Sequence, residues 1–308
     1  MSRLKLSVLL TALILCFCFA MSANAAPRVF VAASGNDGNN CSSLAPCKTI
    51  MHALNVVDTK GEVVISESGE YDNIIITKSV TVAAAPGIYA GITANTQDGV
   101  NILRLWIDDI VVLRNLTIKG TAAIPEISGI NNSTAGNLFI DGCNISGVTY
   151  GIWNSAPGKT TVHDTTVRNC QIGINISSPV GVINWAVVDN SRAERNNTGI
   201  TIGSNARVTV HNSILFANST GVRVSSILQG IQAEATIESS VFHVNGIAIT
   251  VVGGSGGTGL ARLSKNTISK NLTGVNVTAS GTAYSLQDNL IAGNDVDIAG
   301  ALTPLSHN

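Results

Sequence analysis

Five residues that alternate between acid and histidine recur along the middle of the chain, and their types could do chemistry. This acid–His column consists of Asp141, His163, Asp189, His211 and Glu238, which follow one another at intervals of 22, 26, 22 and 27 residues. Alternating carboxylate and imidazole groups could bind a metal ion or act as general acid and base. If each interval is one turn of a repeating fold, neighbouring members lie about 5 Å apart. Two acids separated by one turn then lie roughly 9–10 Å apart, inside or just beyond the ~6.5–9.5 Å separation of inverting glycosidases.

The acid–His column also has a simpler interpretation, which we favour. A solvated corner of a repeating fold would alternate acid and histidine because like charges stacked directly upon each other are unfavourable. The sequence itself indicates no pocket beside the column. We therefore expect neither a metal site nor an organic cofactor.

A carboxylate pair beside a tryptophan is the second candidate. Asp108 and Asp109 follow Trp106, and indole rings stack on the faces of pyranose sugars. Asp109 also stands where a corner should precede the strand that we predict for Ile110 to Leu113, and Asp is a frequent corner residue. We favour the corner over a site for sugar chemistry.

An internal repeat predicts the elements that position these residues. Its anchors lie 22 to 27 residues apart and are Val148, Cys170, Asn196, Asn218, Asn245, Asn271 and Asn294. The blocks around the anchors align without a gap, and three columns of each block are apolar. Eight residues before the anchors stand Ile140, Val162, Val188, Val210, Ile237, Leu263 and Leu286. Three before them stand Ile145, Val167, Ala193, Leu215, Phe242, Ile268 and Ile291. Four after them stand Ile152, Ile174, Ile200, Val222, Ile249, Val275 and Ile298.

The spacing of these columns predicts the fold class. The columns are separated by Gly, Asn and Asp and show no helical period, which indicates short strands joined by corners. One copy cannot bury its apolar residues, but stacked copies form a continuous core. We predict an all-β protein, a right-handed single-stranded parallel β-helix of about ten rungs. Copies differ in length after the third apolar column, where loops and a binding face are expected.

The anchor column itself is rich in asparagine. Stacked amides can donate to and accept from one another, so we predict a structural asparagine ladder rather than a catalytic site. Its members are Asn196, Asn218, Asn245, Asn271 and Asn294. The remaining cysteines of the repeat, Cys143 and Cys170, fall in different columns and are predicted to be buried, unpaired thiols.

The chain divides into three predicted regions. Residues 1–25 have a basic start, an apolar stretch from Leu6 to Ala20 and a small-residue cleavage site after Ala25, as in a signal peptide. Residues 26–60 form an N-terminal cap with a disulfide between Cys41 and Cys47 and a short amphipathic helix within Cys47 to Val57; a metal site is the alternative for these two cysteines. Residues 61–308 form the β-helix. Its last residues show no comparable cap, which leaves room for self-association.

Composition excludes two classes of partner. The formal net charge is −1 and only 12% of residues are charged, so we expect no nucleic-acid footprint. No other apolar stretch approaches the ~20 residues of a membrane span. The predicted signal peptide places the protein in the periplasm or outside the cell.

Five segments in the first 120 residues carry a resemblance to a known family: Phe30 to Gly35, Pro46 to Ile50, Gly61 to Ile65, Ile74 to Val82 and Val111 to Ile118. They resemble the N-terminal part of secreted bacterial β-helix proteins of the pectin-lyase-like superfamily. The resemblance implies a right-handed parallel β-helix. It does not imply an activity, because the superfamily holds pectate lyases, polygalacturonases and pectin methylesterases as well as tailspikes and adhesins.

The catalytic sets of the enzymes in that superfamily do not match this chain. We find no Gly-His-Gly with Asp-Asp and Arg-x-Lys of the polygalacturonase type, and no Gln-Ala-Val or Gln-Asp-Thr of the methylesterase type. No set of calcium-binding carboxylates with an Arg or Lys base stands out either. Calcium is expected only if the chain is a lyase.

Three functional hypotheses remain. The first, which we favour, is a secreted module that binds a carbohydrate or another surface polymer without catalysis. The second is a polysaccharide lyase or glycoside hydrolase, with the acid–His column as its site. The third is an adhesin or assembly subunit that associates through its C-terminal end.

Overall fold

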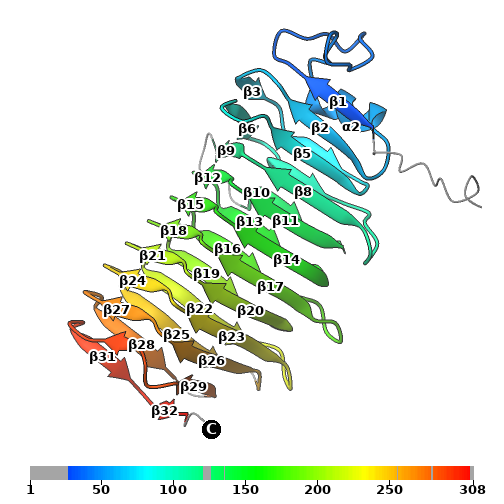
Figure 1. Cartoon of the computed structure of the whole chain (residues 1–308). Helices are drawn as coiled ribbons and strands as arrows, with labels where there is room; N and C mark the ends of the chain where they lie inside the picture. The colour runs from blue at the N-terminus through cyan, green and yellow to red at the C-terminus, as the bar shows by residue number, and fades with distance from the viewer. Residues whose placement is uncertain (1–26, 121–125, 135, 255, 279, 306–308) are drawn as a thin grey trace, which may run out of the picture.

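The computed structural model describes residues 27–305 with gaps at 121–125, 135, 255 and 279. The predicted signal peptide, with its cleavage site after Ala25, lies outside these residues. The described chain winds into one elongated stack of β-strands (Figure 1), with all strand pairs parallel except one isolated bridge. This is the all-β parallel solenoid that the repeat predicts.

Three parallel sheets form the walls of the stack, and each turn of the chain visits them in the same order. The first sheet has twelve strands: β1 (Arg28–Val31), β2 (Gly61–Ile65), β5 (Val80–Ala84), β8 (Ile110–Arg114), β11 (Asn137–Asp141), β14 (Gly158–His163), β17 (Asn184–Asp189), β20 (Ala206–His211), β23 (Gln232–Glu238), β26 (Thr258–Ser264), β29 (Gly281–Ser285) and β32 (Leu302–Pro304).

The second and third sheets have ten strands each. The second sheet consists of β3 (Gly69–Tyr71), β6 (Ala90–Ala94), β9 (Leu116–Gly120), β12 (Asn144–Ser146), β15 (Thr166–Arg168), β18 (Arg192–Glu194), β21 (Ile214–Phe216), β24 (Val241–His243), β27 (Thr267–Ser269) and β30 (Leu290–Ile291). The third sheet consists of β4 (Ile74–Ile76), β7 (Val100–Ile102), β10 (Ser128–Asn132), β13 (Tyr150–Asn154), β16 (Ile172–Ile176), β19 (Thr198–Ile202), β22 (Thr220–Ser226), β25 (Ile247–Gly253), β28 (Thr273–Val277) and β31 (Val296–Ala299).

The three apolar columns of the sequence are the inner faces of the three sheets. In the middle of the stack Val188, Ala193 and Ile200 come from successive strands of one turn, and each is at most 2% exposed. Burying a valine or isoleucine side chain such as Val188 or Ile200 contributes about 1.5–3 kcal/mol. Neighbouring turns add to the same core, so each turn is stabilised by the turns on either side of it.

The alignment of the repeat that the sequence predicts is wrong at its last copy. Leu263 pairs with Ser285 and not with Leu286, so the gapless alignment is wrong by one residue there. Gln287, just after this point, has a φ of 64°. The chain takes up an extra residue at this corner, and the register is restored at Asn289, which accepts from Asn266.

A short helix covers the N-terminal end of the stack. Helix α2 (Ile50–Val56) begins at the N-cap Thr49, whose side chain accepts from the backbone N of His52. Ile50, Ala53 and Leu54 are buried on one face, which is the amphipathic face that the sequence predicts. At the other end Ile298 is 44% exposed, although the same column is buried in the turns that precede it.

Candidate functional site

The acid–His column lies along one edge of the first sheet. Its members are the last residues of β11, β14, β17, β20 and β23, and direct register pairs each member with the next. A left-handed corner follows each strand: Asp164 and Asn190, for example, have φ values of 47° and 46°. The corner turns the chain toward the second sheet and leaves the column half-exposed to solvent.

Both histidines of the column contact carboxylates of neighbouring turns. His163 Nδ1 lies 2.9 Å from Asp141 Oδ1, and His163 Nε2 lies 3.7 Å from Asp189 Oδ2. His211 Nδ1 lies 2.7 Å from the other oxygen of Asp189. Because an ionised carboxylate only accepts, the imidazoles donate in the short contacts. The alternation predicted from sequence is therefore a chain of hydrogen-bonded pairs.

The hydrogen bond with Asp141 raises the pKa of His163 against the opposing effect of desolvation, and the negative charges of Asp141, Asp189 and Asp164 raise it further. Cationic side chains lie at both ends of the acid–His column. Arg114 Nε lies 3.6 Å from Asp141 Oδ2, and Lys265 Nζ lies 3.9 Å from a carboxylate oxygen of Glu238. Each acid of the column thus has a histidine, an arginine or a lysine beside it.

A groove lies on the outer face of the first sheet, beside the column. It encloses about 400 Å³ across β14, β17, β20 and β23. Trp185, which is 52% exposed, lines its middle. Direct register places Lys159 on one side of Trp185 and Arg207 on the other. We call this the Trp185 groove.

Charge and ring contacts organise the Trp185 groove. The guanidinium carbon of Arg207 lies 4.9 Å from the centroid of the Trp185 ring, a cation–π distance. Arg207 Nε also lies 3.4 Å from a carboxylate oxygen of Glu234, which Arg262 contacts as well. The side chain of Lys159 has no ion-pair or hydrogen-bond partner in the part of the chain that the structure describes. Lys159 is therefore the unpaired cation of this groove.

A second groove continues the first toward the N-terminus. It encloses about 360 Å³ over β8, β11 and β14, and Thr161 lines both grooves. Its lining includes Phe139, which is 39% exposed, together with Asp141 and His163. We call it the Phe139 groove. Two members of the acid–His column, Asp141 and His163, therefore line the N-terminal part of a channel, although the sequence indicated no pocket beside them.

Asp108 and Asp109 occupy different environments. Asp109 accepts from the Ser79 hydroxyl at 2.6 Å and from the Trp106 backbone N at 2.8 Å, and these hydrogen bonds lower the pKa of its carboxyl group. Asp109 is thus used to build the corner before β8. Asp108 is exposed and has no partner among the described residues. The structure does not bring the pair into a shared site.

The asparagine column is a stacked ladder inside the corner between the second and third sheets. The backbone N and the side-chain Nδ2 of Asn218 both donate to Asn245 Oδ1, at 3.0 Å each, and Asn245 repeats this toward Asn271 at 2.8 and 2.9 Å. Each ladder Nδ2 also donates to a backbone carbonyl of the preceding turn, as from Asn245 to Leu215 at 2.8 Å. These bonds satisfy backbone groups that the corner would otherwise leave unpaired.

A second ladder lines the corner between the first and second sheets, and the sequence analysis missed it. Backbone N groups donate to side-chain oxygens one turn further on, as from Ser191 to Ser213 and from Ser213 to Ser240 at 3.2 and 3.1 Å. A column five residues before each anchor could have revealed it: Cys143, Thr165, Ser191, Ser213, Ser240, Asn266 and Asn289. Cys143 and Cys170 are free and buried, as predicted.

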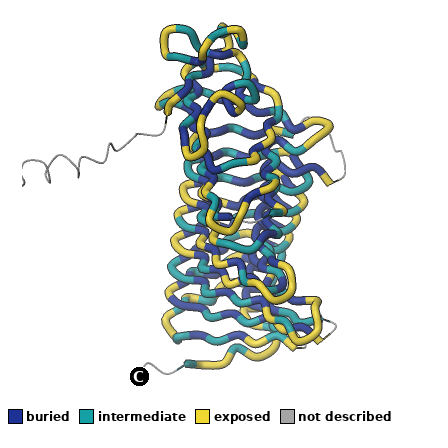
Figure 2. Tube along the Cα trace, turned by 90° about the vertical axis from the view of Figure 1, so that its right-hand side faces the viewer, coloured by how far each residue is buried: buried dark blue, intermediate teal, exposed yellow. Residues whose placement is uncertain are grey.

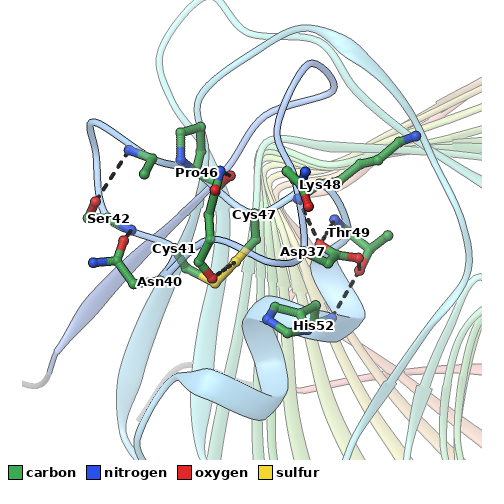
Figure 3. Close-up of a disulfide and its surroundings, with 12 residues drawn as sticks. Asp37, Asn40, Cys41, Ser42, Pro46, Cys47, Lys48, Thr49 and His52 are labelled. Carbon is green, nitrogen blue, oxygen red and sulfur yellow. Dashed lines mark hydrogen bonds between the residues drawn. A yellow bond between two sulfur atoms is a disulfide. The ribbon is translucent and has the colours of Figure 1, made fainter.

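The cap contains the predicted disulfide between Cys41 and Cys47 (Figure 3). His52 lies beside it, with its ring nitrogen and the two sulfur atoms within 4.8 Å of one another. Disulfide sulfurs are not thiolates, so these residues could hold a metal only after reduction. Asp37 fixes the start of α2: despite desolvation, hydrogen bonds from Thr49 and Lys48 lower the pKa of its carboxyl group.

Among the described residues no helix is both long and apolar enough to span a membrane.

Comparisons with known proteins agree with this architecture. A family described as the right handed beta helix region matches residues 128–295. Similar solved structures include a protein named XylC solved with xylose, at 10% identity over 85% of this chain and 68% of that chain with a TM-score of 0.56. A rhamnogalacturonan lyase matches at 14% identity over 83% and 75% of the two chains with a TM-score of 0.52. An alginate lyase from a Paenibacillus species matches at 17% identity over 90% and 99% with a TM-score of 0.51. No curated protein matches the chain. At these identities the likeness is one of fold alone.

Proposed function

The chain belongs to the right-handed β-helix family, as its resemblance to pectin-lyase-like proteins predicted, and on that premise we propose that it is an exported module that binds a polysaccharide without cleaving it. The bound polymer lies along the outer face of the first sheet, in the Trp185 groove and the Phe139 groove. The exposed Trp185 in the middle of this channel is the observation that carries the proposal.

The dimensions of the channel support a linear ligand. It runs across β8, β11, β14, β17, β20 and β23. Parallel strands lie about 4.8 Å apart, so the channel is roughly 24 Å long. Both grooves are shallow and open, which suits a chain that passes through rather than a small molecule that is enclosed.

The side chains of the channel suit sugar units that carry negative charge. Trp185 offers an apolar ring face with a polar edge, which is typical of binding surfaces that contact amphipathic ligands. Lys159 adjoins it without a carboxylate partner, whereas Arg207 is shared with Glu234. An anionic polymer would thus meet one cation that is free to pair with it.

The state of the acid–His column supports binding without catalysis. Asp141 and Asp189 are engaged by histidines of neighbouring turns. A carboxylate of this column would have to give up one of these contacts before it acted as a nucleophile. None of the catalytic sets of the related enzymes is present in the sequence.

The proposal is tested by a binding screen of the mature protein on acidic and neutral polysaccharides. We expect an acidic polymer to bind, and we expect Trp185→Ala to weaken binding about tenfold or more, since truncating a central aromatic residue typically costs about 2 kcal/mol or more. Trp153→Ala, which changes a tryptophan of the third sheet, is the matched control. Equal affinity of the wild type and Trp185→Ala for every bound polymer would refute the proposed face.

Catalysis remains the alternative, favoured by one observation. His163 lines the Phe139 groove, and its raised pKa makes it a candidate proton donor near neutral pH. The enzyme would then be a lyase or hydrolase that uses His163 with Asp141 or Asp189, and calcium would be needed only for the lyase.

Assembly is the third candidate, and the last turn favours it. Leu290, Val296 and Ile298 are 58%, 47% and 44% exposed, so an end-to-end contact would bury apolar surface. A molar mass that rises with protein concentration, and that Ile298→Lys returns to the monomer value, would support self-association. A constant mass would exclude it.

A further inference from the structure

A notch on the third sheet lies outside the channel of the first sheet. It encloses about 380 Å³, within the size range of small-molecule sites. Its lining is drawn from three successive turns, β16, β19 and β22 with the connections that follow them: Ser177, Ser178, Thr201, Gly203, Ser204, Arg223, Ser225, Ile227 and Leu228. None of these residues lines either groove of the first sheet.

Unequal loop lengths create the notch. The connections 177–183 and 227–231 project at the edge of the stack, where Figure 1 shows them beyond β17 and β23 and the view of Figure 2 faces loops of exposed residues. Between them the connection 203–205 is tight. Ser178 N donates to Ser204 O at 2.9 Å, and Asn205 Nδ2 donates to Pro179 O at 2.6 Å. These bonds hold one wall of the notch against its floor.

Gly203 has no side chain, which leaves space at the floor of the notch. A Cβ atom added at this position would lie 3.0 Å from the Cβ of Ser177 and would crowd that wall of the notch. The two walls carry exposed apolar side chains, Val180 on one loop and Ile227 on the other, which are 66% and 67% exposed. Of the two, Ile227 lines the notch, together with Leu228.

The floor of the notch holds one cation and no anion. Arg223 is exposed, and its side chain makes no ion pair or hydrogen bond with any described residue. Five hydroxyl groups accompany it, and no Asp or Glu lines the notch. Register places Thr201 next to Arg223 on the neighbouring strand. An unpaired guanidinium among hydroxyls is suited to an oxyanion, to which it can donate two parallel hydrogen bonds.

An unsatisfied hydroxyl supports a ligand in this place. Ser178 is only 5% exposed, and its Oγ has no hydrogen-bond partner in the part of the chain that the structure describes. A buried polar group without a partner costs free energy, which is recovered when a partner is supplied. Ser178 lies in the wall of the notch, so a ligand bound there is the nearest source of the missing partner.

We propose that this notch is a second binding site, which takes a small hydroxylated ligand through an oxyanion group: carboxylate, sulfate or phosphate. The oxyanion pairs with Arg223, hydroxyls of the ligand meet Thr201, Ser177 and Ser225, and its apolar edge contacts Ile227. The site does not depend on the channel of the first sheet, because the two share no residue.

The test is a titration of the mature protein with glucuronate, glucose 6-sulfate, glucose 6-phosphate and uncharged glucose, followed by amide chemical shifts. We expect at least one anionic sugar to bind, with shifts at residues 201–204 and 223–228, and glucose not to bind. The anionic sugar with the highest affinity identifies the source of the oxyanion. No binding by any anion, equal binding of glucose, or shifts confined to the Trp185 groove would overturn the proposal.

Two variants test the role of Arg223. Arg223→Gln removes the cation, and Thr201→Asp places a carboxylate beside it; each should weaken binding about tenfold or more, as expected for the loss of a charge-assisted hydrogen bond. Arg195→Gln changes an exposed arginine outside the notch and should leave the affinity unchanged. Unfolding curves that match the wild type show that the variants are folded. Unchanged affinity in Arg223→Gln would refute the assignment.

Discussion

Replacing one asparagine of the ladder tests how the corners are stabilised. Asn245→Leu keeps the shape of the side chain but removes its acceptor and its donor. Two buried backbone groups lose their partner: the N–H of Asn218, which is 3.0 Å from Asn245 Oδ1, and the carbonyl of Leu215, which is 2.8 Å from Asn245 Nδ2. At about 1–3 kcal/mol for each unsatisfied group, the free energy of unfolding should fall by about 2–6 kcal/mol.

The loss is large against the stability of a typical domain, which is about 5–15 kcal/mol. Urea denaturation followed by circular dichroism measures it, and hydrogen exchange of the Asn218 amide reports the broken contact directly. Asn276→Leu is the matched control, because Asn276 lies on the outer face of β28 without a side-chain partner among the described residues, and its effect should stay within about 0.5 kcal/mol. A loss below about 1 kcal/mol in Asn245→Leu, with unchanged exchange at Asn218, would refute the reasoning.

Three further predictions concern pH, redox state and the core. Asp141 raises the pKa of His163, so protonated His163 stabilises the folded protein. This stabilisation is fully present below the ordinary histidine pKa of about 6.5 and is lost as pH rises through the raised pKa of the folded state. The difference in unfolding free energy between wild type and His163→Gln should therefore shrink between about pH 5.5 and pH 9, and a constant or growing difference would contradict it. Reducing the Cys41–Cys47 disulfide, whose cysteines are 6 residues apart, should lower the free energy of unfolding by about 2 kcal/mol. Denaturation with and without reductant measures this, and a Cys41→Ser/Cys47→Ser variant should not respond to reductant. Ile200→Ala should cost about 2–5 kcal/mol because Ile200 is 1% exposed, whereas Val187→Ala on the outer face should cost much less; similar losses in urea denaturation would place the core elsewhere.

The core was predictable because it repeats. Val188, Ala193 and Ile200 each stand at a fixed distance from the anchor Asn196, and the inside of the stack admits only apolar residues at these positions. The asparagine ladder follows the same logic, since an amide can bond to its copy one turn away. At the last copy the corner takes one more residue, and column matching alone could not detect the shift at Leu286.

The candidate site was only partly predictable because binding residues do not repeat. Sequence columns placed Asp141, His163 and Asp189 in direct contact along one edge. They did not reveal the channel, because Lys159, Trp185, Arg207 and Glu234 share a column eleven residues before their anchors but no residue type. Packing does not restrict the residue types in a column that faces outward. The function of such a column therefore depends on the surface that its members form together.

The unequal lengths of successive turns were the other feature of the sequence that pointed to a site. Intervals of 26, 22 and 27 residues between Cys170, Asn196, Asn218 and Asn245 predict a short connection between two longer ones. The notch around Arg223 is formed in this way. Its unpaired guanidinium could not be foreseen, because pairing depends on which carboxylates the fold brings near.

The central claim is binding without cleavage, and a combined assay tests it most directly. The mature protein is incubated with each polysaccharide that it binds, with calcium and with chelator, while unsaturated products and new reducing ends are followed together. We predict retained binding and no product under either condition. Turnover by the wild type that disappears in His163→Ala or Asp189→Ala would contradict the claim and would make the acid–His column the active site of an enzyme.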